Sequence, residues 1–151
     1  MTVSLEARLQ RLEDLEEIRD VLNAYGRTLD EKDAPAYAAL FAEDAEWSGG
    51  GYSASRRTGI QQMVERLFAT APPPVGSSHV MTSMMIELDG DTAKSWCRWM
   101  LVIPGPDGKP TIRVAGRYID ELARIDGRWK FRTRHLTHDL RAPVAPPPAQ
   151  S

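Results

Sequence analysis

The stretch SSHVMTSMMIELDGDTAKSWCRWMLVI, residues 77–103, decides the fold of this chain. Two runs with the composition of strands flank Asp89-Gly90-Asp91, which is typical of the compact turn of a β-hairpin. The pattern continues beyond residue 103, so the sequence predicts four long strands that form an antiparallel meander. Their expected ranges are 77–88, 92–103, 111–125 and 128–140.

The residues before this region have the spacing of helices. Apolar residues recur at steps of three and four over residues 5–29, which predicts a long helix with one apolar stripe. A second helix is predicted to begin after Asp33 and to carry Phe41 near its end, and a third is predicted over residues 58–68. A short strand is expected over residues 45–48.

Helices followed by strands indicate an α+β fold. We expect a curved antiparallel sheet packed on three N-terminal helices, with an apolar pocket between the sheet and the long helix. Six aromatic side chains either line this pocket or fill the core: Trp47, Trp96, Trp99, Tyr118, Trp129 and Phe131.

Composition restricts the possible partners and location. The length of 151 residues predicts one domain over residues 1–140, followed by a disordered Pro- and Ala-rich tail at residues 141–151. The net charge is −2 and the alternating Arg132 and Arg134 are interpreted as a solvated face, so no nucleic-acid partner is expected. The chain has a single cysteine, Cys97, and neither a secretion signal nor a long apolar stretch. We therefore expect a cytoplasmic protein with no membrane partner.

A carboxylate, an imidazole and a phenol form the candidate catalytic set: Asp30, His79 and Tyr25. These three groups suffice for proton abstraction and for assistance to a leaving group without a cofactor. The period of a strand puts His79 on one face with Met81, Ser83 and Met85. Asp30 falls on the polar side of the first helix, so it faces the pocket only if the helix ends there.

Three segments give the chain a family resemblance: ALFAEDAEW at residues 39–47, GRYIDEL at 116–122 and DGRWKF at 126–131. Together they resemble the nuclear-transport-factor-2-like superfamily, and its SnoaL-like branch in particular, over residues 5–140. The resemblance implies a cone-shaped, cystatin-like roll around a deep apolar pocket. It also implies a homo-oligomer, dimer or trimer, because members of this fold commonly associate through the sheet.

Within that superfamily the pattern is similar to scytalone dehydratase, bile acid 7α-dehydratase and hexachlorocyclohexane dehydrochlorinase. The resemblance implies that His79 acts as base or acid, Asp30 orients it, and Tyr25 polarises the substrate oxygen. The expected reaction is a lyase reaction on a small hydrophobic or cyclic substrate, with no metal and no cofactor. Two alternatives stay open: an isomerase or polyketide cyclase with the same base, and a non-enzymatic module for ligand binding or dimerisation.

Five residues are predicted to bind substrate: Trp47, Trp99, Tyr118, His135 and His138. His135 shares the face of Trp129 and Phe131 by strand period, and the resemblance places His138 near the sequence position where the bile acid enzyme has an arginine. The two histidines are three residues apart on a strand, so they point to opposite faces and do not favour a metal site.

Overall fold

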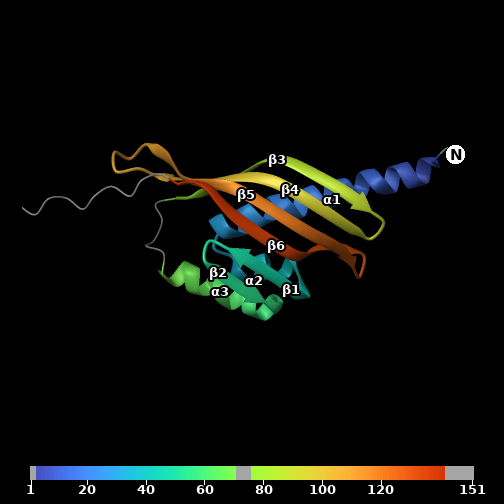
Figure 1. Ribbon diagram of the computed structural model, residues 1–151, viewed down its shortest axis with the longest axis horizontal. Coiled ribbons are helices and arrows are strands. Elements are labelled where there is room, and N and C mark those ends of the chain that lie inside the picture. The colour runs from blue at the N-terminus through green and yellow to red at the C-terminus, as the bar shows by residue number, and fades with distance from the viewer. Residues whose placement is uncertain (1–2, 71–75, 142–151) are drawn as a thin grey trace, which may run out of the picture.

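A computed structural model describes residues 3–70 and 76–141 of the chain (Figure 1). These residues form the elements α1 (Leu5–Asp30), α2 (Ala34–Ala39), β1 (Phe41–Gly49), β2 (Tyr52–Ser55), α3 (Arg56–Thr70), β3 (Ser78–Asp89), β4 (Thr92–Pro104), β5 (Pro110–Ile125) and β6 (Arg128–Arg141). The six strands make one curved, unclosed sheet in the order β2-β1-β6-β5-β4-β3. Helix α1 packs along the meander, whereas α2 and α3 lie beside β1 (Figure 1).

The four long strands confirm the predicted meander. Strands β3 to β6 begin and end within one residue of the expected positions, and each pairs antiparallel with the next. Asp126 and Gly127, with φ of 50° and 75°, form the turn between β5 and β6, which is the backbone of a type I′ hairpin. The α+β fold is therefore confirmed. The prolines at 72–74 and the predicted tail after Arg141 lie outside the described residues.

Strand β1 is longer than the sequence predicts, and it makes the sheet mixed rather than purely antiparallel. Phe41 begins β1 instead of ending α2, and β1 runs parallel to β6 with Phe41 opposite Phe131. The backbone N–H of Phe131 donates to the Leu40 carbonyl at 2.9 Å, and the Phe41 ring is fully buried. Packing against β6 thus overrides the local helical pattern. Strand β2, which the sequence analysis missed, pairs antiparallel with β1.

The prediction of one apolar stripe along α1 is wrong. Ile18, Leu22 and Tyr25 are buried, whereas the leucines of the first two turns are 54–78% exposed. The seven apolar steps from Leu5 to Leu29 span 24 residues, or about 3.4 residues a step, which is less than one helical turn of about 3.6. The stripe therefore drifts around the helix, and only its later part faces the sheet.

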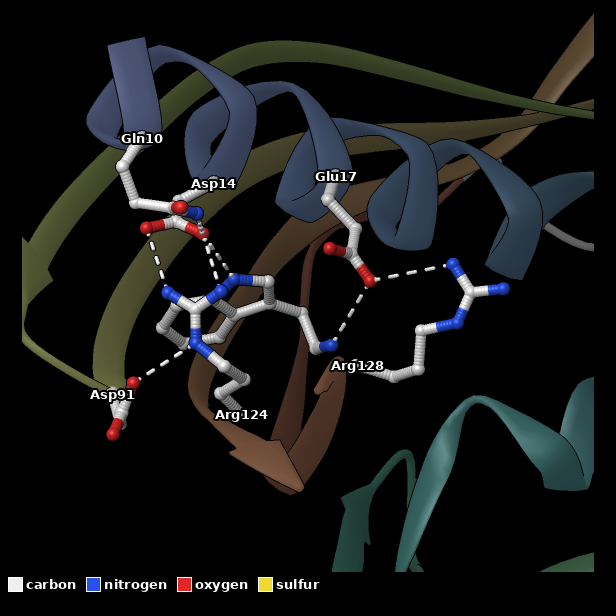
Figure 2. A network of polar contacts seen from close by, with 7 residues as sticks. Gln10, Asp14, Glu17, Asp91, Arg124 and Arg128 are labelled. Atoms are coloured by element: carbon white, nitrogen blue, oxygen red, sulfur yellow. Dashed lines mark hydrogen bonds and ion pairs between the residues drawn. The ribbon is translucent and has the colours of Figure 1, made fainter. Parts of the chain in front are cut away.

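Asp14 fixes the middle of α1 to the far end of the sheet (Figure 2). Asp14 is 4% exposed, and its carboxylate accepts hydrogen bonds from Arg124 at 2.7 Å and from Trp129 Nε1 at 3.2 Å. Arg124 also donates to Asp91 at 2.9 Å, and Glu17 accepts from the Trp129 backbone. Burial raises the pKa of Asp14, but its donors outweigh burial and hold that pKa below the usual value.

Five register shifts interrupt the strand pairing among the described residues, and two of them change where the predicted site residues point. In β3, Ser83 has a φ of 52° and the register with β4 shifts between Thr82 and Met85. The second shift, between Glu121 and Leu122 of β5, inserts an extra residue into β6. A bulge of one residue reverses the faces of everything that follows it. Met84 therefore turns inward in place of Ser83 and Met85, which corrects the predicted face of His79.

Candidate active site

Asp30 and His79 are in direct contact at the end of α1. The Asp30 carboxylate accepts the backbone N–H of His79 at 2.8 and 3.1 Å, and His79 Nδ1 lies 2.6 Å from Asp30 Oδ1. The hydroxyl of Ser77 donates to the same oxygen at 3.4 Å. Three donors from one segment of chain thus hold this carboxylate in a single orientation.

The local backbone explains why these two residues meet. Helix α1 ends at Asp30, and Lys32 adopts a left-handed φ of 57° that turns the chain away. Asp30 is therefore free to point at β3. The sequence predicts that Asp30 can face inward only if the helix ends there, and the helix does end there. Four residues earlier, a side chain on Gly26 would press within 3.2–3.3 Å of His79. Glycine at this position lets β3 approach the helix closely.

The geometry gives the two nitrogens of His79 different roles. Nδ1 donates to Asp30 in the neutral imidazole, which leaves the lone pair of Nε2 available to accept a proton. Once protonated, the imidazolium faces a carboxylate at ion-pair distance. The two side chains are 16% and 23% exposed, so the pair is shielded from water but still accessible. The His79 ring stacks on Trp99 with centroids 6.3 Å apart.

Tyr25 lies deeper in the core than the pair. It is 1% exposed, and its hydroxyl accepts from the Tyr37 hydroxyl at 3.0 Å and from Trp47 Nε1 at 2.9 Å. Burial raises the pKa of Tyr37 well above its usual value, so Tyr37 keeps its proton and can donate it. The phenol of Tyr25 thus contacts other core side chains rather than Asp30 or His79.

A buried ion pair beside Tyr25 was not predicted. Arg134 and Asp120 are each 1% exposed and lie 3.4 Å apart, and Ser95 donates to Asp120 at 2.8 Å. The Arg134 guanidinium is 3.9 Å from the ring centre of Tyr25 and 3.7 Å from that of Tyr118, which are cation–π contacts. Burial raises the pKa of Asp120 despite the opposing effects of Arg134 and Ser95. The interpretation of Arg134 as a solvated residue is therefore wrong.

Trp99 presents an unsatisfied donor on the same side of the sheet as His79. It is 4% exposed, and its Nε1 has no hydrogen-bond acceptor among residues 3–70 and 76–141. The register places Trp99 opposite Gly116 and Gly116 opposite His138. Because Gly116 has no side chain, the indole reaches across β5, and its ring lies 5.7 Å from that of His138. Burial, and then Arg141, lower the pKa of His138.

The structure separates the five predicted substrate-binding residues. Trp47, Trp99 and Tyr118 are buried in the core cluster, and His138 is half-buried beside Trp99. His135 is exposed on the other face, where Nδ1 lies 2.9 Å from the Ser48 hydroxyl. The extra residue in β6 explains this correction, since it turns Arg134 inward and His135 outward.

The interior beside Tyr25 is packed with aromatic rings. Tyr25 lies within 4.9–6.3 Å of the rings of Tyr37, Phe41, Tyr118 and Phe131. A hollow of about 290 Å³ lies between the start of β3 and the β4–β5 turn and includes Ser77, which bonds Asp30. Another, of about 450 Å³, lies at the opposite end of the meander. Neither hollow is lined by His79 or Tyr25.

In residues 3–70 and 76–141, no three His, Cys, Asp or Glu side chains are arranged to hold a metal ion. No helix within those ranges is long and apolar enough to cross a membrane.

Comparison with known families agrees with this fold. Residues 10–135 match the family model of the SnoaL-like domain. The chain belongs to the SnoaL-like family. No curated protein shows significant similarity to it in sequence.

Solved structures place this SnoaL-like chain among proteins with the cystatin-like fold. An NTF2-like protein from Novosphingobium aromaticivorans is 24% identical, with a TM-score of 0.79 and 92% of each chain covered. LinA is 23% identical, with a TM-score of 0.78, covering 91% of this chain and 94% of its own. A provisionally assigned scytalone dehydratase from N. aromaticivorans is 24% identical, with a TM-score of 0.72 and coverage of 93% and 97%. At these identities the similarity establishes the fold.

Proposed function

We propose that this SnoaL-like protein is a cofactor-independent lyase that removes water or another leaving group from a small cyclic or aromatic compound. The observation that carries the proposal is the 2.6 Å contact between His79 Nδ1 and Asp30 Oδ1 beside an apolar interior. A carboxylate that orients an imidazole is a recurring device of general acid–base catalysis. Similarity to LinA, a hexachlorocyclohexane dehydrochlorinase, supports the same class of reaction by analogy.

In this mechanism His79 moves the proton. Its Nε2 takes a proton from a substrate carbon next to an activating carbonyl. The electrons of that C–H bond form a C=C bond as the neighbouring C–O bond breaks, and His79 returns the proton to the departing oxygen. Water leaves and the imidazole is restored. Asp30 holds Nδ1–H throughout and stabilises the imidazolium, and such catalysis contributes about 10²–10⁴-fold.

The substrate oxygen is expected to bind where the structure leaves polar groups available. Trp99 Nε1 is a buried donor without an acceptor among the described residues, and His138 lies beside it. An oxygen bound there would satisfy the indole. In the proposal, Trp47 and Tyr118 contact the substrate ring, and Tyr25 polarises the substrate oxygen by donating its own O–H, because its hydroxyl is the acceptor in both of its bonds to Tyr37 and Trp47.

The packed interior favours a second candidate, a non-enzymatic binding or dimerisation module. The rings of Tyr37, Phe41, Tyr118 and Phe131 pack within 4.9–6.3 Å of the Tyr25 ring, which is the packing of a filled core rather than of an open substrate pocket. Under this reading the Asp30–His79 bond is structural: it fixes the end of α1 to β3.

An activity screen separates these functions. Ring ketones with a hydroxyl or halide β to the carbonyl are incubated with the protein, and the released leaving group and unsaturated product are quantified. The lyase proposal predicts turnover by the wild type and a loss of about 100-fold or more in His79→Ala. His135→Ala is the matched control, because His135 lies on the outer face. Rearrangement without release of a leaving group would indicate the isomerase alternative, and binding without conversion would favour the module.

A further inference from the structure

The first turns of α1 carry an apolar face that nothing in the described chain covers. Leu5, Leu9 and Leu12 are 78%, 54% and 62% exposed, and every residue from Leu5 to Glu13 is exposed. Figure 1 shows this end of α1 projecting past the ends of the strands, beyond the β3–β4 turn. Exposed large apolar side chains that gather on one face mark an interaction site more often than scattered ones do.

This face is distinct from the face that packs on the sheet. At about 100° per residue, Leu5, Leu9 and Leu12 lie within about 60° of one another. Their mean direction is about 140° from that of the buried Ile18, Leu22 and Tyr25. A partner bound to the leucines would therefore contact α1 on the side away from its own domain.

The spacing of these leucines is that of a helix pair. Steps of four and three residues are the steps of a coiled-coil seam, which repeats every seven residues. The next position of the seam is Glu16, which pairs with Arg19 at 3.1 Å within its own helix. A helix packed along this seam would therefore contact α1 only at positions before Glu16.

The charges beside the leucines identify the partner. Arg8 lies about 70° to one side of the seam and Glu13 about 70° to the other, and neither makes an ion pair with another described residue. In a parallel pair of identical helices, opposite flanks meet with an offset of five residues, so Arg8 faces Glu13 of the second copy, twice by symmetry. In an antiparallel pair, like flanks meet, and each arginine would face an arginine.

We propose that residues 5–13 of α1 pair in parallel with the same residues of a second copy of this chain. Leu5, Leu9 and Leu12 form the seam, and Arg8 and Glu13 set its direction. The surface is self-complementary, which favours a second copy over a foreign protein. Three leucines a side fall short of the ~1,200 Å² that stable interfaces bury, so we expect reversible association, with a Kd between about 10 µM and about 1 mM.

Cysteine cross-linking in the full chain tests both the contact and its direction. The only native cysteine, Cys97, is buried, so any disulfide between two copies is expected to come from the introduced cysteine. Under mild oxidation, a parallel pair predicts that Leu5→Cys, Leu9→Cys and Leu12→Cys each form disulfide dimers by themselves. Arg11→Cys, on the other side of the same exposed turns, is the control and should form no disulfide dimer.

Charge reversal gives an independent readout by sedimentation. Arg8→Glu and Glu13→Arg should each weaken dimerisation at least fivefold, and an equimolar mixture of the two variants should restore it. Dimers from Leu9→Cys alone would indicate an antiparallel pair and overturn the proposal. Cross-linking of Arg11→Cys to the same extent as the leucine variants would overturn it as well. So would the absence of cross-linking in every variant, even if copies of the chain assemble through the sheet.

Discussion

Replacing Asp30 by asparagine should switch the tautomer of His79. The two carboxylate oxygens have different tasks: Oδ2 accepts the His79 backbone N–H at 2.8 Å, and Oδ1 accepts Nδ1–H at 2.6 Å. Asparagine has a single acceptor oxygen. The backbone N–H cannot give up its proton, so the amide oxygen must turn to it, and the amide NH2 then faces Nδ1. Nδ1 becomes an acceptor and the proton moves to Nε2.

The size of the effect follows from the bonds involved. A mismatched pair of donors costs about 1–3 kcal/mol, which makes the original tautomer roughly 5- to 150-fold less populated in Asp30→Asn. Exchanging charge-assisted for neutral hydrogen bonds should lower the free energy of unfolding by about 1–3 kcal/mol. A base locked as Nε2–H cannot accept a proton there, so turnover should fall by about 10²–10⁴-fold.

Nitrogen-15 NMR of the imidazole rings measures the tautomer without a substrate. The chain has only three histidines, so the spectrum is simple to assign at a pH where the rings are neutral. Wild type should show Nδ1–H for His79 and Asp30→Asn should show Nε2–H. Asp33→Asn is the control, because asparagine caps α2 as well as aspartate does. Nδ1–H in both Asp30→Asn and wild type would refute the reasoning.

Three further changes test the surrounding structure by chemical denaturation. Gly116→Ala should lower the free energy of unfolding by about 2 kcal/mol or more, since its methyl group would collide with a backbone carbonyl of β6; a smaller change would mean that β5 has room there. Asp14→Asn should cost about 2–3 kcal/mol at neutral pH by weakening the contact with Arg124. Because the folded pKa of Asp14 is lowered, this difference should persist above about pH 4 and shrink as pH falls through the folded pKa; a difference independent of pH would contradict the account. Tyr25→Phe should cost about 1–3 kcal/mol, because Trp47 Nε1 loses its acceptor, and an unchanged stability would show that the indole finds another.

Local pattern sufficed for the meander, and family resemblance was needed for the catalytic pair. Strand composition and turn residues placed β3 to β6 to within one residue. No local signal joins Asp30 to His79, because the contact depends on where α1 ends and how closely β3 approaches Gly26. The drift of the apolar stripe around α1 could have been predicted from the sequence, because its mean step of about 3.4 residues is shorter than a helical turn.

The inward Arg134 and outward His135 could not be predicted from alternation. A strict period of two puts His135 with Phe131, and only the extra residue in β6 reverses this. Bulges of this kind arise from the pairing of two strands, so neither sequence alone marks them. The same reasoning applies to Ser83, whose left-handed backbone carries no glycine or asparagine to signal it.

The central claim is that His79 removes a proton from carbon, and isotope exchange tests it most directly. A cyclic ketone that lacks a leaving group is incubated with the protein in D2O, and deuterium at the carbon beside the carbonyl is followed by NMR or mass spectrometry. We predict exchange by the wild type and a loss of about 100-fold or more in His79→Ala, with His135→Ala unaffected. Equal exchange by wild type and His79→Ala would contradict the account.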